Sequence, residues 1–222
     1  MINETPTLGT GMLAMFVNLA PQWRSEFRDW LQADMFAARL GIGFHACASY
    51  DVISGSHPTQ ARPQQFLTVY SMANVGCLYA EPYQALRRSR DQRDALFHER
   101  FTDVERYTLG WVGPEIARSD SEFDAIVHVD RFDLVPEQAQ DFNSWFVTQY
   151  LPTCNYIKGL TRLRRYTPIE GQPGVCLFHE FSSLDTLADE DWQRIRNDTM
   201  WSRIDAQDGG CASYRRVIRS SS

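Results

Sequence analysis

The sequence has no pair of cysteines at the spacing of a metal site or a disulfide framework. Its five cysteines, at positions 47, 77, 154, 176 and 211, are scattered and never form a C-x-x-C motif. Structural zinc sites and the disulfide frameworks of small secreted proteins both need paired spacing, so neither is expected. Unpaired thiols are typical of a reducing compartment, and a cytoplasmic location is therefore predicted.

The chain also lacks a long apolar run and a stripe of basic residues. The apolar segment 12–20 is much shorter than the roughly 20 residues of a membrane-spanning helix, and it follows Glu4 rather than a basic region. Neither a membrane span nor a signal peptide is predicted. The formal net charge is −6, and an acidic protein repels phosphate backbones, so nucleic acid is not an expected partner.

Motifs that hold nucleotides or activate a serine are missing as well. The sequence has no glycine-rich phosphate loop, no P-loop and no serine nucleophile elbow. No cofactor is therefore expected. What the chain does have is aromatic residues, which make up 13% of it. Such rings fill cores and line pockets for flat apolar molecules, so a small hydrophobic or aromatic substrate is the expected partner.

An internal repeat organises the chain. Aligning Pro21 with Pro136 sets an offset of 115 residues. At this offset Phe27 matches Phe142 and Trp30 matches Trp145, and after one inserted residue Gly43 matches Gly159 and Tyr50 matches Tyr166. Near the ends of the units, Tyr107 falls opposite Tyr214. Duplication of one unit explains these matches together, and it predicts two domains, at 11–118 and 124–219.

Each unit has the same predicted order of elements, βαββαβ, and the units are joined through 113–122. The predicted strands are 12–20, 43–52, 66–72 and 105–112 in the first unit and 125–134, 159–168, 175–181 and 211–218 in the second. This order is that of ferredoxin-like α+β domains, with an antiparallel four-stranded sheet and both helices on one face. Because a bare apolar sheet face costs stability, the two repeats are expected to pack sheet-to-sheet as an intramolecular barrel.

At this point the repeat resembles the dimeric α+β barrel superfamily. It looks most like the fused, two-lobed relatives of EthD-type and antibiotic-biosynthesis-monooxygenase-type proteins. The resemblance is carried by the openings LAMFVNLAP and VDRFDLVP, the Phe-x-x-Trp helix, the closing Tyr strand and the segment HEFSS. It implies a small-molecule pocket between each sheet and its helices. The superfamily includes cofactor-free oxygenases, cyclases, isomerases, dehydratases, decarboxylases and some haem binders, so the fold does not decide the function.

Two ionisable residues on the first strand of the second unit are the leading catalytic candidates. His128 and Asp130 alternate along the strand and share one face, whereas the valines beside them face the other way and suit the junction between the sheets. The pair is therefore expected beneath the helices. Its counterparts in the first unit are Leu13 and Met15. This difference between the units favours an active pocket in the second one.

His179 is the third catalytic candidate. It lies in the middle of strand 175–181, close to the position from which cyclases of the resembled superfamily present a histidine. On a ferredoxin-like sheet the first and third strands are neighbours, so His128 and His179 could face one pocket. Asp130 would orient His128 and hold it basic for proton transfer. Both histidines could instead be hydrogen-bonded core residues. A metal held by these three residues is not predicted, because the strand geometry is poor for it.

Six further residues are candidates for contacts with the substrate. They are Phe132 on the His128 face, Trp145 as an aromatic wall, Tyr166 as a hydrogen-bond donor, Arg164 as a partner for a carboxylate, and His45 and Tyr70 in the first unit. For the repeated tyrosines, packing is the simpler interpretation; for Arg164 it is a solvated edge, and for His45 a core or surface role. His57, in a loop, and His98, in a polar helix, read as solvent-exposed.

The leading functional hypothesis is a cofactor-independent lyase or isomerase. It would carry out cyclase- or dehydratase-like proton transfer on an aromatic or polyketide-like substrate, with His128, Asp130 and His179 as acid–base residues. One alternative is a cofactor-free monooxygenase of an electron-rich phenol, and another is a barrel that binds a hydrophobic ligand without turnover. Pairing of the whole chain into a homodimer stays open.

Overall fold

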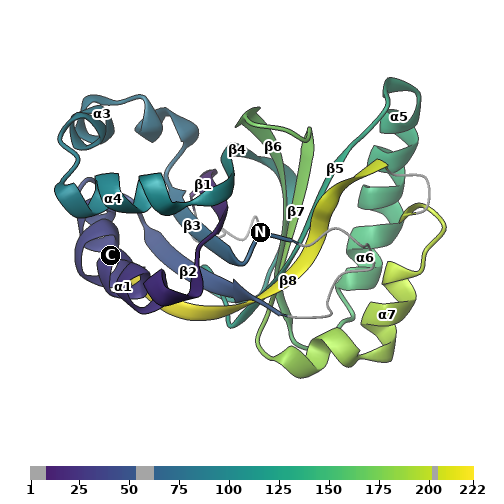
Figure 1. Cartoon of the computed structure of the whole chain (residues 1–222). Coiled ribbons are helices and arrows are strands. Elements are labelled where there is room, and N and C mark those ends of the chain that lie inside the picture. The colour runs from purple at the N-terminus through teal and green to yellow at the C-terminus, as the bar shows by residue number, and fades with distance from the viewer. Residues whose placement is uncertain (1–8, 54–62, 202–204) are drawn as a thin grey trace.

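Eight antiparallel strands close into a barrel in the computed structural model, which describes residues 9–53, 63–201 and 205–222, with the backbone alone for 205–209. The order around the barrel is β1-β3-β2-β8-β5-β7-β6-β4 (Figure 1). The strands are β1 (Gly11–Asn18), β2 (Ala46–Val52), β3 (Phe66–Met72), β4 (Thr102–Ala117), β5 (Ile126–Asp133), β6 (Leu160–Glu170), β7 (Val175–Phe181) and β8 (Asp205–Ser221). The fold is therefore α+β, as predicted, and its barrel has no free strand edge.

The barrel is built from two sets of four consecutive strands. The first half of the chain contributes β4-β1-β3-β2 and the second half contributes β8-β5-β7-β6. The halves are hydrogen-bonded to each other at two seams, between β2 and β8 and between β4 and β6. The last strand of each half is longer than predicted, because it pairs within its own half and across a seam. The expected connection 113–122 is consequently strand as far as Ala117, which pairs with Arg162.

Helices cover the outer face of the barrel on two sides (Figure 1). The helices of the first half are α1 (Arg24–Trp30), α2 (Phe36–Leu40), α3 (Glu81–Arg88) and α4 (Gln92–Arg100), and those of the second half are α5 (Pro136–Trp145), α6 (Leu151–Cys154) and α7 (Glu190–Arg196). Pro21 and Pro136 each stand in the first helical turn of their half, where a missing N–H costs nothing. No helix among the described residues is long and apolar enough to cross a bilayer.

An irregular turn recurs at the same place in both halves. The helix after the first strand widens into a single π-helical turn at Leu31–Met35 and again at Phe146–Tyr150, at the offset of 115 residues seen in the sequence. Both matched glycines also adopt a left-handed backbone, with φ of 95° at Gly43 and 84° at Gly159. Because π-helical turns are rare, their recurrence at this offset supports the internal repeat.

The apolar residues form three cores, one inside the barrel and one beneath each set of helices. The four repeated tyrosines all point into the barrel, together with Val127 and Val129. Phe27 and Trp30 belong to the core under α1–α4, and their counterparts Phe142 and Trp145 to the core under α5–α7. Strand alternation therefore separates the barrel interior from two outer spaces, and the candidate sites lie in the outer spaces.

Candidate active site

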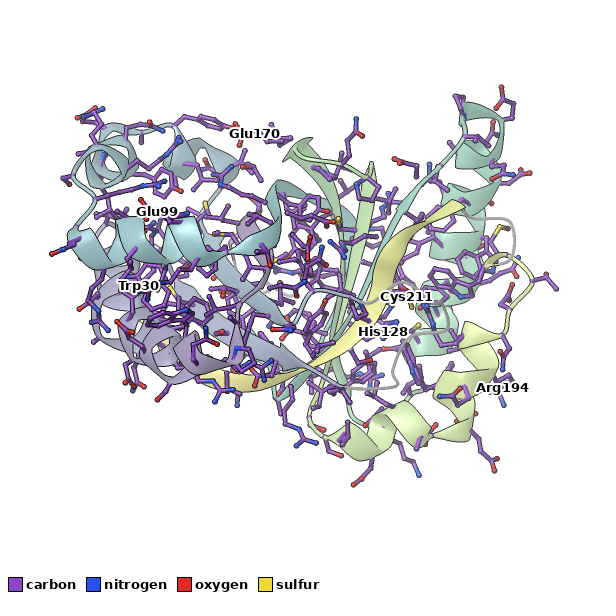
Figure 2. All side chains as sticks on the ribbon, viewed as in Figure 1. Trp30, Glu99, His128, Glu170, Arg194 and Cys211 are labelled. Atoms are coloured by element: carbon purple, nitrogen blue, oxygen red, sulfur yellow. The ribbon has the colours of Figure 1, made fainter. Side chains whose placement is uncertain are left out.

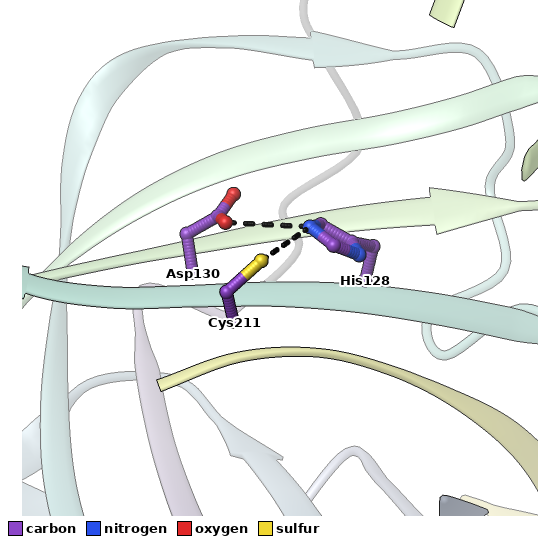
Figure 3. Close-up of side chains that lie close together, drawn as sticks. All are labelled: His128, Asp130 and Cys211. Atoms are coloured by element: carbon purple, nitrogen blue, oxygen red, sulfur yellow. Dashed lines mark hydrogen bonds and ion pairs between the residues drawn. The ribbon is translucent and has the colours of Figure 1, made fainter. Parts of the chain in front are cut away.

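The three predicted catalytic residues meet under the helices of the second half. His128 on β5 and His179 on β7 are direct cross-strand neighbours, and their ring centres are 5.8 Å apart. Asp130 reaches both rings: its Oδ1 is 3.3 Å from His128 Nε2 and its Oδ2 is 3.7 Å from His179 Nδ1. Figure 3 shows the His128–Asp130 contact with Cys211 beside it. We call these four residues the second-half cluster.

Arg196, which the sequence analysis missed, neutralises Asp130. It projects from α7, and its Nη1 and Nη2 donate to Asp130 Oδ2 and Oδ1 at 2.8 and 2.5 Å. Burial alone would raise the pKa of Asp130, which is 3% exposed, but Arg196 and then His128 lower it well below its ordinary value. The carboxylate is therefore ionised, and the charge that balances it is a guanidinium, not an imidazolium.

The expectation that Asp130 would hold His128 basic is wrong. Burial lowers the pKa of His128 and lowers that of His179 to about 3, and the attraction of Asp130 offsets only part of this effect. The hydrogen bonds agree with neutral rings. His128 Nδ1 lies 2.8 Å from Ser213 Oγ, and His179 Nε2 lies 2.8 Å from the Tyr150 hydroxyl. Each ring thus has partners at both nitrogens, and a substrate would have to displace one.

The second-half cluster does not suit a metal ion as it stands. His128, Asp130 and Cys211 have potential ligand atoms within 4.8 Å of one another. However, burial raises the pKa of Cys211 to about 12, so the thiolate that metals prefer is disfavoured. Arg196 Nη2 is also 3.3 Å from Cys211 Sγ and would repel a cation. Haem does not fit through His128 or His179 either, since their ring nitrogens already have partners.

A cavity of about 150 Å³ lies on the opposite side of the barrel, under the helices of the first half. We call it the first-half cavity. Leu13 and Met15, the apolar counterparts of His128 and Asp130, form part of its wall, with Trp30 beside them. Figure 2 shows Trp30 and His128 on the two sides of the barrel. The apolar pair on β1 leaves room for a ligand, whereas Trp192 packs on the imidazole of His128, with ring centres 5.2 Å apart.

A carboxylate–imidazole pair forms part of the wall of this cavity. Asp94 and His98 stand one turn apart on α4, with 3.1 Å between Asp94 Oδ1 and His98 Nε2. Asp91 caps the helix by accepting from the Asp94 N–H at 2.7 Å. Burial alone would raise the pKa of Asp94, but His98 and Arg90 lower it by more than burial raises it. The net pKa is therefore below the ordinary value. The carboxylate is ionised and can orient the imidazole.

His98, which the sequence analysis took as solvent-exposed, is half-buried in the structure. Its side chain is 32% exposed and lines the cavity. Two signals in the sequence could have shown this. Asp94 and His98 have the i, i+4 spacing of neighbours on one face of a helix. Phe97 and Phe101 have the same spacing and lie next to that face. Phe97 is buried and Phe101 lines the cavity. His57, the other histidine read as exposed, lies outside the described residues.

The six residues predicted to contact the substrate do not share one space. Tyr70 lines the first-half cavity, and His45 is half-buried just before β2. Phe132 and Trp145 pack in the core of the second half. Tyr166 and Arg164 lie in the barrel. Arg164 is 5% exposed, not on a solvated edge, because Glu115 accepts from its Nε and the Gly9 carbonyl from its Nη1. Of the six, Tyr70 alone is among the residues that line this cavity.

No protein-family model matches the chain, and no curated protein matches its sequence. Solved structures do match. A provisionally named monooxygenase from Fusobacterium nucleatum has a TM-score of 0.64 at 9% identity, over 96% of this chain and 95% of that one. An anthrone oxidase-like protein has a TM-score of 0.62 at 12% identity, over 98% and 94%. A mutant chlorite dismutase from Candidatus Nitrospira defluvii has a TM-score of 0.60 at 8% identity, over 95% and 92%. At these identities the likeness shows a shared α+β barrel fold and no more.

Proposed function

We propose that this chain is a small-molecule enzyme whose substrate is a planar phenol or enol bound in the first-half cavity. His98 is the base, and Asp94 is its orienting partner. One observation carries the proposal: an ionised carboxylate and an imidazole, 3.1 Å apart, stand on the wall of a cavity that has an apolar side at Leu13 and Met15. Pockets of this kind, with a few convergent polar groups, are where small-molecule enzymes bind their substrates.

The contact between His98 and Asp94 sets the direction of proton transfer. The nearby Asp94 carboxylate favours the tautomer of His98 with its proton on Nε2, which leaves the lone pair on Nδ1 to accept the hydroxyl proton of the substrate. Leu13 and Met15 give the cavity an apolar side against which the ring of the substrate can pack. The cavity measures about 150 Å³, and an apolar cavity of about 150 Å³ accommodates benzene. The substrate is therefore about one aromatic ring in size.

Molecular oxygen is the proposed oxidant. The phenolate gives four electrons to O₂; one oxygen atom forms a bond to a ring carbon, the other leaves as water, and the product is a quinone. The hydrogen lost from that ring carbon and the hydroxyl proton complete the water. Support for this course, beyond the base and the cavity, comes from the shared fold with proteins described as a monooxygenase and as anthrone oxidase-like.

Oxygen uptake by single variants tests this function. A panel of monocyclic phenols is offered to the wild type, His98→Ala, Asp94→Asn and the control His45→Gln. Loss of a general base lowers the rate by about 10²- to 10⁴-fold, and we expect a loss of that size for His98→Ala and a smaller one for Asp94→Asn. The control should keep the wild-type rate, because His45 is not among the residues that line the cavity. An unchanged rate in His98→Ala would remove the proposal.

A lyase or isomerase reaction at His128, Asp130 and His179 is the second candidate. The observation in its favour is that Asp130 lies 3.3 Å from the ring of His128 and 3.7 Å from that of His179. Against it stand the burial of both rings and their lowered pKa values. Product formation without oxygen uptake, abolished in His128→Ala or His179→Ala and retained in His98→Ala, would favour this reaction over the first. Unchanged rates in both variants would exclude it.

The origin of the chain is also a proposal. The recurring π-helical turns support duplication of one ferredoxin-like unit, with units at 11–118 and 124–219 and a kinship to EthD-like proteins. A cytoplasmic location agrees with the free thiols of the five cysteines. The third candidate function is a barrel that binds a hydrophobic ligand without turnover. Binding of the phenols in the panel, with no reaction of any of them, would favour it.

A further inference from the structure

Arginine side chains gather around the first-half cavity, although the chain as a whole has a net charge of −6. Four of them line the cavity, against one carboxylate, that of Asp94. The four are Arg39, Arg87, Arg90 and Arg106. A concave apolar site with an excess of one charge concentrates molecules of the opposite charge. The composition of the wall therefore points to an anionic ligand.

Two of these arginines already have carboxylate partners. Arg106 Nη1 donates to Glu170 Oε2 at 2.9 Å, and Arg90 Nε lies 3.6 Å from Asp94 Oδ2. Arg87 is exposed on α3, at the outer part of the cavity. A ligand that needed any of these three would compete with a carboxylate or with water.

Arg39 is different. Its guanidinium lies 5.2 Å from the ring centre of Tyr83 and 5.9 Å from that of Tyr70. Its Nε is buried and has no hydrogen-bond partner, and no carboxylate among the described residues lies within ion-pair distance of it. A buried donor without a partner costs free energy, and a guanidinium held between aromatic rings is fixed in orientation. The buried Nε itself does not face the cavity, so Arg39, which lines it, can offer an anion there the outer nitrogens of a guanidinium that is held in place and has no carboxylate partner in the described part of the chain.

We infer that the first-half cavity recognises a monocyclic aromatic hydroxy acid, with its carboxylate on Arg39. This inference rests on the proposed function for the role of the hydroxyl. The ring lies against Leu13 and Met15, which have no polar atoms to offer it, and the hydroxyl group meets His98. A planar guanidinium accepts a carboxylate with two parallel hydrogen bonds, a match that Lys does not reproduce.

Isothermal titration with matched probes tests the inference without any need for turnover. The probes are 4-hydroxybenzoate, its methyl ester and phenol, which share the ring and differ in charge. We expect the wild type to bind the acid at least about tenfold more tightly than the ester, the difference of one charge-assisted hydrogen bond. Arg39→Gln should lose this preference and leave the ester affinity unchanged, and Arg39→Lys should keep part of it.

Arg88→Gln is the matched control, since Arg88 also ends a helix of the first half but is exposed and paired with Glu81. It should bind all three probes as the wild type does. Equal wild-type affinities for acid and ester would overturn the inference, and this comparison needs no variant to fold. Loss of acid and ester binding to the same extent in a folded Arg39→Gln would overturn it too, because Arg39 would then act through packing.

The two proposals fail separately. Acid binding that depends on Arg39, together with full turnover by His98→Ala, would contradict the proposed base and leave the anion site intact. Turnover of phenols that depends on His98, together with equal affinity for acid and ester, would contradict the anion site alone.

Discussion

At the scale of single residues, burial decides the state of each charged group. Asp130 keeps its charge at 3% exposure because Arg196 supplies two donors to it. The histidines beside it lose theirs, because desolvation of an imidazolium outweighs one carboxylate that is already paired. The sequence could place His128, Asp130 and His179 together from strand alternation. It could not place Arg196, which comes from a distant helix, and so it missed the residue that balances the charge of Asp130.

Removal of Arg196 tests this account of Asp130. Arg196→Met leaves a buried carboxylate without its cation, which costs about 3–5 kcal/mol when a buried pair loses one partner. The double variant Asp130→Leu with Arg196→Met should recover part of that loss, since no charge remains buried. Urea unfolding at pH 7.5 measures both. A single variant as stable as the wild type would show that Asp130 does not depend on Arg196.

The pH dependence of stability reports on the neutral histidines. The pKa values of His128 and His179 are lowered in the folded state. Their contribution to the free energy of unfolding is therefore complete above about pH 6.5. It declines as the pH falls, because the unfolded chain binds protons that the folded chain does not. Each such imidazole adds a slope of up to about 1.4 kcal/mol per pH unit. Urea unfolding between pH 7.5 and pH 4.5 should show a shallower slope in His179→Gln than in the wild type. Equal slopes would contradict a neutral His179.

At the scale of elements, most of the strands were predicted from the sequence. The strand ends that form only by pairing with a distant strand were missed. Strands 66–72 and 175–181 match the structure in full, because their apolar runs are bounded by loop signals. The last strand of each half was predicted too short, since part of its extra length pairs across a seam that no local pattern reports. A pocket was expected in each half, with the active one favoured in the second. The actual place of the cavity depends on which wall side chains leave space, and that is a property of packing.

The paired glycines make a prediction at this scale. A Cβ at Gly43 would meet nothing within 4 Å, whereas one at Gly159 would lie 2.3 Å from Thr186 Oγ1. Both positions have positive φ, which costs a non-glycine residue about 1–2 kcal/mol. Gly159→Ala should therefore be more destabilising than Gly43→Ala, by the further 1–3 kcal/mol or so of overpacking.

Thermal and urea unfolding of the two single variants measure this difference. Thr186→Ala in the Gly159→Ala background should restore most of the extra loss, since it removes the hydroxyl that the new Cβ meets. Equal losses in the two single variants would mean that the turns tolerate a side chain alike and that the close approach at Gly159 is not rigid.

At the scale of the whole molecule, the closed barrel joins the halves, and the two candidate sites lie on opposite sides of it. Arg131 of β5 crosses the interior to the first half, where its guanidinium lies 4.0 Å from the ring centre of Phe16 and pairs with Glu105. In the other direction, from the first half to the second, the Tyr50 hydroxyl donates to the Asp124 carbonyl at 3.0 Å. These contacts tie the two halves together across the barrel interior. The first-half cavity is open to a ligand, and the second-half cluster is packed around its own ion pair.

A crystal structure of the chain with 4-hydroxybenzoate is the most direct test of this division between the halves. We predict the ring in the first-half cavity, its carboxylate on the guanidinium of Arg39 and its hydroxyl group within hydrogen-bonding distance of His98. A ligand seated against His128 and His179, with the first-half cavity empty, would contradict the account.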